Sequence, residues 1–273
     1  MTLELSATKP PVPAGRRQCL LAALALGLAP FQARPQVLDL NDAINKAGRQ
    51  RMLSQRMAKC YMALGLEVQT ADAERLMSAS MALFDRQLVE LKAFSPTPEI
   101  RDTYQRLEST WGDYKTMLVG AKASKVGARS VLQQAGLVLP MANQGTLQLE
   151  AVSGKPMGRL VNISGRQRML SQRMAAFYLS ASWGVQTTAA AAEIDKARGE
   201  FVTALKLLKD APEATPAIRR ELEMADQQWA FFDGALRTLQ QGTPSVRAVT
   251  DVFTSSERIL QVMDAVTGLY AKV

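Results

Sequence analysis

Apolar residues recur every three or four positions along most of the chain, which places them on one face of a helix. Runs of alternating β-branched residues, the mark of strands, are scarce. We therefore expect an all-α protein, with helices at about 42–68, 71–94 and 125–152 and another starting near Pro98. The apolar positions of the second helix show the spacing most clearly: Leu76, Met77, Met81, Phe84, Leu88 and Leu91.

One stretch of eleven residues occurs twice without a change. Gly48–Ala58 reappears as Gly165–Ala175, at an offset of 117 residues. We call the two copies the repeated block. Elsewhere the halves share mainly their apolar pattern, although Trp111 and Trp229 fall at equivalent places. The sequence thus predicts an internal duplication.

Each half is expected to form four helices joined by short turns, the pattern of an antiparallel bundle. The expected units are residues 34–152 and 159–273, with residues 153–158 as the linker. A threonine followed by proline, as at Thr97 and Thr215, is a strong helix start. Pro140 should interrupt and kink the fourth helix. Its counterpart should start at Thr243-Pro244 and run to residue 271.

Residues 1–33 are predicted to be a signal peptide. Arg16 and Arg17 precede an apolar run from Cys19 to Ala29, and Ala33 offers a cleavage point. The run is too short for an ordinary membrane span, although an uncleaved anchor is an alternative. We therefore expect an exported, periplasmic protein.

The composition narrows the function classes. The chain has no histidine, which removes the commonest general base and transition-metal ligand. We expect no enzyme activity, no metal and no cofactor. Removal of residues 1–33 would take the net charge from +8 to +6, which suits an anionic ligand or an acidic surface. Nucleic acid is not expected as a partner, because acids are interspersed with the basic residues and an exported protein seldom meets DNA.

On a helical wheel the repeated block has two faces. Leu53, Met57 and Cys60 lie at about 120° to 180° from Gly48 and predict an apolar stripe. The opposite face carries Arg51, Gln55, Met52 and Lys59. If two such faces met about a pseudo-two-fold axis, Arg51 would approach Arg168. Two guanidinium groups at about 4 Å repel by roughly 4 kcal/mol at an effective dielectric near 20, and a bound oxyanion would reverse the sign.

Plainer interpretations exist for the same residues. Arg49 and Arg56 flank the polar face, where arginines are usually solvated. Cys60 aligns with Phe177, which indicates a buried and inert thiol, and the methionines are expected to fill the core. The Gly-x-x-Arg-x-x-Ser spacing of the block could also serve only to set how closely two helices approach.

Residues 45–56 and 162–173 resemble the P-box of the periplasmic sensor domain in NarX-type nitrate and nitrite sensor kinases. The same pattern heads the PilJ-type domain of type IV pilus chemotaxis transducers. The resemblance implies a dimerising four-helix bundle that holds its ligand between two first helices, with the arginines gripping the anion and the glycines lending backbone contact. The candidate ligand-binding residues are Arg51, Arg168, Gly48, Gly165, Asn45, Asn162, Gln55 and Gln172.

Because both P-boxes occur in one chain, an intramolecular pair could replace the homodimer. Alternatively, each box could face outward and pair with another chain. We expect a sensor for a small inorganic oxyanion, nitrate or nitrite first, that signals through a partner protein. The alternative is a helical scaffold linked to type IV pili or chemotaxis receptors, with no small ligand.

Overall fold

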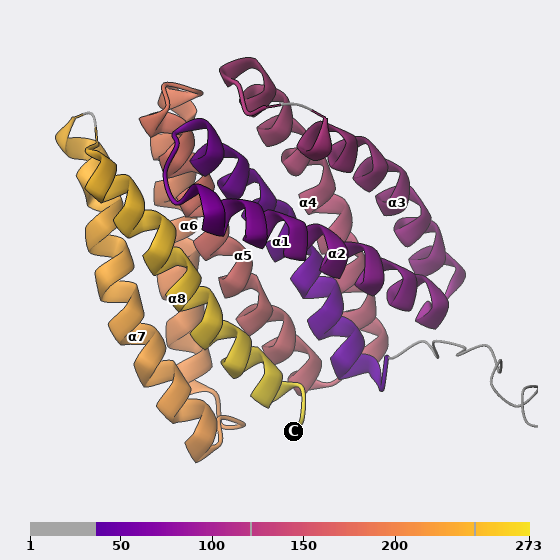
Figure 1. The fold of residues 1–273 in the computed structure, drawn as a ribbon. Coiled ribbons are helices and arrows are strands. Elements are labelled where there is room, and N and C mark those ends of the chain that lie inside the picture. Colours follow the sequence, from indigo (N-terminus) through magenta and orange to yellow (C-terminus); the bar gives the residue numbers. More distant parts are fainter. Residues whose placement is uncertain (1–36, 121, 243) are drawn as a thin grey trace, which may run out of the picture. The chain divides into compact units, whose positions relative to one another are not determined.

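A computed structural model describes residues 37–120, 122–242 and 244–273. This part of the chain is built from eight α-helices and one short 3-10 helix, with no strand, and confirms the all-α prediction (Figure 1). The elements are α1 (Leu40–Gly65), α2 (Thr70–Phe94), α3 (Pro98–Val119), α4 (Lys125–Ser153), α5 (Pro156–Ser182), α6 (Thr187–Asp210), α7 (Pro216–Arg237), η1 (Thr238–Gln241) and α8 (Val246–Tyr270).

The helices form two tandem bundles with the same internal order. In the first, α1 packs along α2 and α4, and α3 packs along α4 and more lightly against α2. In the second, α5 packs along α6 and α8, and α7 packs along α8 and more lightly against α6. The bundles meet along α1 and α5, the most extensive helix–helix contact in the described residues. We call this contact the α1–α5 seam, and it places the two copies of the repeated block against each other.

Side chains cap the starts of several helices, as predicted at Thr97 and Thr215. The Asp39 carboxylate accepts a hydrogen bond from the backbone N–H of Asp42 at 2.8 Å, and Thr97 and Thr215 cap α3 and α7 through their hydroxyl groups. Such caps satisfy backbone N–H groups that have no partner within the helix. The cap of α8 is Ser245 rather than Thr243-Pro244, and Thr243 lies outside the described residues.

The prediction that Pro140 interrupts the fourth helix is wrong. Helix α4 is assigned without a break from Lys125 to Ser153, with Pro140 inside it. Val138 and Ala142, on either side, are buried in the core, and this packing holds the helix together although proline removes one backbone hydrogen bond. The connection to α5 is only Gly154 and Lys155, and Gly154 takes the left-handed conformation that a helix end requires (φ 59°).

An aromatic stack marks the equivalent place in each bundle core. Phe84 stacks on Trp111 with ring centroids 4.1 Å apart, and Phe201 stacks on Trp229 at 4.3 Å. The two tryptophans are therefore structural equivalents, as the duplication predicted. Cys60 is buried and free of any disulfide, and burial raises its pKa to about 11, in line with an inert thiol.

The predicted signal peptide, residues 1–33, lies outside the described residues. Among the helices that the structure does describe, none combines the length and the apolar character needed to cross a membrane.

Candidate functional site

Arg51 and Arg168 lie at the centre of the α1–α5 seam, and both are completely buried. A Cβ atom on Gly48 would stand 3.1 Å from Nη2 of Arg51 and 3.5 Å from Nη2 of Arg168. On Gly165 the corresponding distances would be 3.8 and 3.0 Å. The two guanidinium groups therefore converge within one chain, between the two glycines.

The Arg51 guanidinium is held by neutral oxygen atoms. Its Nη1 donates to Oδ1 of Asn143 on α4 at 2.8 Å. Its Nη2 crosses the seam and donates to Oδ1 of Asn162 at 2.7 Å and to the Asn162 carbonyl at 3.3 Å. Its Nε is buried and finds no acceptor among the described residues. Arg51 thus lies in the interior as a charge bonded to amides and carbonyls.

The Arg168 guanidinium also bonds across the seam and to the fourth helix of its bundle, but its partners differ from those of Arg51. Its Nη2 crosses the seam in the other direction and donates to the Asn45 carbonyl at 3.1 Å. Its Nη1 donates to Oδ1 of Asp264 on α8, a carboxylate where Arg51 meets an amide. The two arginines that were expected to repel each other are therefore both held by hydrogen bonds from within the chain.

Two further arginines of the repeated block complete a cluster around this centre. Arg49 donates to the same Oδ1 of Asp264 at 2.7 Å, and Arg166 pairs with Glu200 and reaches Oδ1 of Asn143 at 3.5 Å. We call the four residues, Arg49, Arg51, Arg166 and Arg168, the arginine cluster.

The predicted solvated face at Arg49 and Arg56 is wrong. The two side chains are about one-fifth exposed, at 21% and 18%. They bind carboxylates on α8, which lies in the other bundle. Lys59, one turn beyond Arg56, is fully buried and binds Glu257 and the Ser256 hydroxyl. These residues tie α1 to α8 across the boundary between the bundles.

Gln55 and Gln172 make no hydrogen bond to Arg51 or Arg168 among the described residues. Gln55 and Gln172 donate to backbone carbonyls of Ala135 on α4 and Ser256 on α8, at 3.3 and 2.9 Å. These two candidate ligand-binding residues therefore brace the fourth helix of each bundle. Asn45 and Asn162, by contrast, lie at the arginines, as the resemblance implied.

Burial and like charge both act on the two central arginines. Burial, together with the positive charges of Arg166 and Arg168, lowers the pKa of Arg51 to about 9. Burial also lowers the pKa of Arg168, to about 10, while Asp264 opposes the shift. Both groups remain charged at neutral pH, and the greater shift at Arg51 reflects its lack of a carboxylate partner among the described residues.

The glycines of the block provide room for the guanidinium groups. Gly165→Ala is expected to destabilise the protein by about 1 kcal/mol, because the new Cβ would crowd Nη2 of Arg168, which Asp264 and Asn45 hold in place. Gly199 on α6 is the matched control, since a Cβ there meets no atom within 4 Å. Gly199→Ala should stabilise by about 1 kcal/mol through helix propensity, and equal urea midpoints for the two variants would contradict this account.

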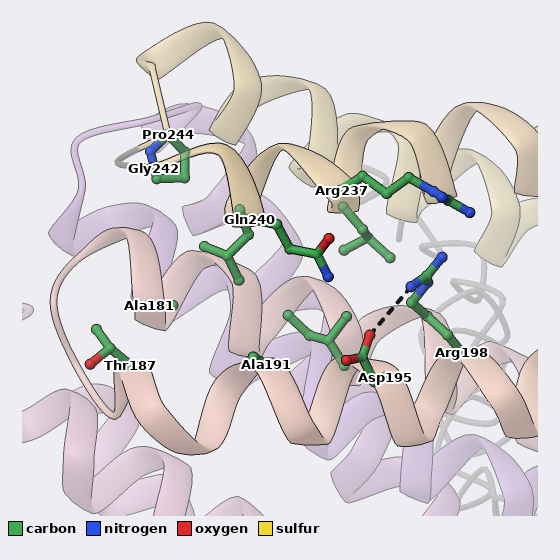
Figure 2. Close-up of a pocket in the computed structure, with 12 residues that line it drawn as sticks. Ala181, Thr187, Ala191, Asp195, Arg198, Arg237, Gln240, Gly242 and Pro244 are labelled. Carbon is green, nitrogen blue, oxygen red and sulfur yellow. Dashed lines mark hydrogen bonds and ion pairs between the residues drawn. The ribbon is translucent and has the colours of Figure 1, made fainter.

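Among the cavities at the second bundle, one is lined by Arg166 of the arginine cluster. This cavity of about 360 Å³ opens beside Asn143 and Arg166 and continues between α4, α5 and α6. Another of about 500 Å³ lies between the end of α5, α6, α7 and η1, where Asp195 pairs with Arg198 (Figure 2). The second cavity does not touch the arginine cluster. No group of Cys, Asp and Glu side chains in the described ranges is arranged to hold a metal ion.

Sequence reasoning missed Asn143, Asp264 and Glu257. For Asn143 and Asp264 a sequence signal exists in the two serines, Ser124 and Ser245, that cap α4 and α8. Aligning these caps gives an offset of 121 residues, which sets Asn143 against Asp264. The offset of 117 taken from the block does not apply to the fourth helices. The stretch of chain between the repeated block and the last helix is longer in the second unit than in the first.

The sequence of the chain matches a known protein family. The chain matches the PilJ family, described as the N-terminal domain of type IV pili methyl-accepting chemotaxis transducers, twice, at residues 36–136 and 153–253. The two matches cover most of the sequence, and the chain belongs to this family.

One relative shows where the family occurs. Over 124 residues the chain is 35% identical to the methyl-accepting chemotaxis protein McpN of Pseudomonas aeruginosa. The aligned part is 41% of this chain and 23% of the relative, so the chain spans about a quarter of that protein. No solved structure matches. The family description and the name of the relative both refer to methyl-accepting chemotaxis.

Proposed function

We propose that this protein is an exported sensor module that binds a small oxyanion, nitrate or nitrite first, at the α1–α5 seam. The exported, periplasmic location is part of the proposal, and it rests on the predicted signal peptide and on the family. The output would pass to a partner protein of a chemotaxis or pilus system. The candidate ligand-binding residues nearest the seam centre are Arg51, Arg168, Gly48, Gly165, Asn45 and Asn162.

The observation that carries the proposal is the burial of two guanidinium groups side by side. An isolated buried charge is costly, and Arg51 is bonded only to amide and carbonyl oxygens among the described residues. A planar oxyanion matches the guanidinium fork and would supply the missing negative charge. Nε of Arg51, which has no acceptor in the described part of the chain, is a donor ready for it.

The position of the arginines also suits signalling. They lie where the bundles meet, so an anion there would contact both bundles at once. A ligand shifts a conformational equilibrium only if it binds one arrangement more tightly than another. An anion between Arg51 and Arg168 would favour the arrangement that keeps α1 and α5 close.

A scaffold without a small ligand is the second candidate, and one observation favours it. Many polar side chains of the repeated block already bind within the chain, such as Gln50 to the Phe84 carbonyl and Gln167 to the Phe201 carbonyl. Identical blocks could therefore persist for packing alone.

Calorimetry separates the two candidates. Nitrate is expected to bind the full chain at one site, and Arg51→Ala should abolish the heat. At 100 times its dissociation constant, nitrate should add about 2.7 kcal/mol to the free energy of unfolding. Arg101 on α3 is exposed, and Arg101→Ala is the control with the same change of charge. Absence of heat with nitrate, nitrite and chloride, together with an unchanged melting temperature, would favour the scaffold.

A further inference from the structure

The fourth helices of the two bundles present equivalent side chains to the arginine cluster. When α4 and α8 are aligned by their serine caps, Asn143 and Asp264 coincide. Oδ1 of Asp264 accepts hydrogen bonds from Arg168 and Arg49. Oδ1 of Asn143 accepts from Arg51 and Arg166, the pseudo-symmetric counterparts. The two positions are therefore one site repeated, with a single difference of charge.

Because of that difference, the four arginines of the cluster do not all have a direct carboxylate partner. Asp264 is paired with two of its four members, and Glu200 is paired with Arg166. Arg51 is the member without a carboxylate partner in the described residues. Glu150 comes closest, through Asn162, whose side-chain amide donates to it. The one guanidinium group of the cluster without a direct ion pair in the described residues thus lies on the Asn143 side of the seam.

We infer that Asp264 is an internal counter-ion that closes the Arg168 half of the seam, so that one monovalent anion binds on the Arg51 half, beside Asn143. This inference rests on the proposed function and deepens it, because it names the half of the site and the charge of the ligand. An amide can turn its Nδ2 donor toward an anion. A carboxylate at the same place would repel the anion and occupy the arginines itself.

The charge count decides between monovalent and divalent anions. The four guanidinium groups of the cluster face three carboxylates, Asp264, Glu200 and, through Asn162, Glu150, so one negative charge balances the cluster and the two charges of sulfate exceed it. Burying an unbalanced charge is costly. The wild-type site therefore prefers nitrate over sulfate, and Asp264 is the residue that sets this preference.

The test moves the carboxylate from one half to the other. Asn143→Asp should weaken nitrate binding at least tenfold and raise the melting temperature of the anion-free protein. Asp264→Asn should lower that melting temperature and increase sulfate affinity at least tenfold. The swap variant, which combines both substitutions, should regain nitrate binding, now lost with Arg168→Ala rather than with Arg51→Ala. Calorimetry with sodium nitrate and sodium sulfate, and melting curves without either anion, are the measurements.

The outcomes separate this inference from the function it rests on. If wild-type protein binds nitrate but Asn143→Asp binds it equally well, the sensor stands and the counter-ion role of Asp264 is overturned. If wild-type protein binds no anion, the proposed function fails, and the melting temperatures still decide whether Asp264 balances the cluster. Unchanged melting temperatures in both single variants would overturn that role as well.

Discussion

Glu257→Gln is expected to lower the free energy of unfolding by about 3 kcal/mol. Its carboxylate pairs with Arg56 and with Lys59, whose side chain is completely buried. Glutamine keeps the shape but leaves the Lys59 ammonium with the Ser256 hydroxyl and the Phe253 ring, 4.5 Å away. Removing one partner of a buried pair is costly because the other charge remains buried. Urea unfolding measures the loss.

Two further variants make this test specific. Asp72 pairs with Arg75 on the surface, and Asp72→Asn should cost less than about 1 kcal/mol. Adding Lys59→Met to Glu257→Gln should recover part of the loss, because an apolar pair replaces the stranded charge. A loss at Glu257 no larger than at Asp72 would show that the link between α1 and α8 is not stabilising.

The same carboxylate predicts a loss of stability in acid. Burial acts to raise the pKa of Glu257, but Lys59 and Arg56 outweigh it and lower the pKa to about 2. Because this lies below the ordinary value of 4.5, the carboxylate stabilises the native state above that pH. A contribution of about 3 kcal/mol is lost as the pH falls from about 4.5 to 2. Glu257→Gln should lose this part of the pH dependence.

Phe201→Ala is expected to cost about 4 kcal/mol of unfolding free energy. The ring is completely buried in the second bundle and stacks on Trp229, and deleting such a ring removes apolar burial and leaves a cavity. Phe231 on α7 is 70% exposed, so Phe231→Ala is the matched control and should change the free energy by less than about 0.5 kcal/mol. Similar losses for the two variants would contradict the assigned core.

Much of the fold could be predicted because its signals are local. The caps at Asp39 and Thr97 and the apolar spacing of α2 depend on residues a few positions apart. The approach of Arg51 to Arg168 could also be anticipated, since two identical helix faces tend to pack symmetrically. The wheel placed both arginines opposite the apolar stripe, and the α1–α5 seam buries that face.

The partners of the arginines could not be predicted in the same way. Asp264 and Glu257 lie about 200 residues from Arg49 and Arg56 in the sequence. Their pairing depends on the packing of α8 next to α1, which belongs to the other bundle. Arg56 and Arg173 occupy the same place in the block, yet Arg56 binds α8 of the other bundle and Arg173 binds Glu193 of its own. Identical sequence therefore led to different contacts, because the surrounding helices differ.

The duplication explains why the difference between Asn143 and Asp264 matters. In a symmetric pair of bundles the two arginines would have the same partners and the seam would have no preferred half. Here Asn143 and Asp264 break the symmetry where the arginines of both blocks converge. A single chain that carries both bundles can hold such a difference permanently, whereas two copies of one subunit have identical sequences.

The most direct test of the account is a crystal structure of the full chain grown with nitrate. We predict planar density bonded to the Arg51 guanidinium, between α1 and α5 of the same chain and beside Asn143. If Arg51 keeps its bonds to Asn143 and Asn162 and no nitrate lies next to it, the arginine cluster serves only to hold the two bundles together. The sensor proposal is then wrong.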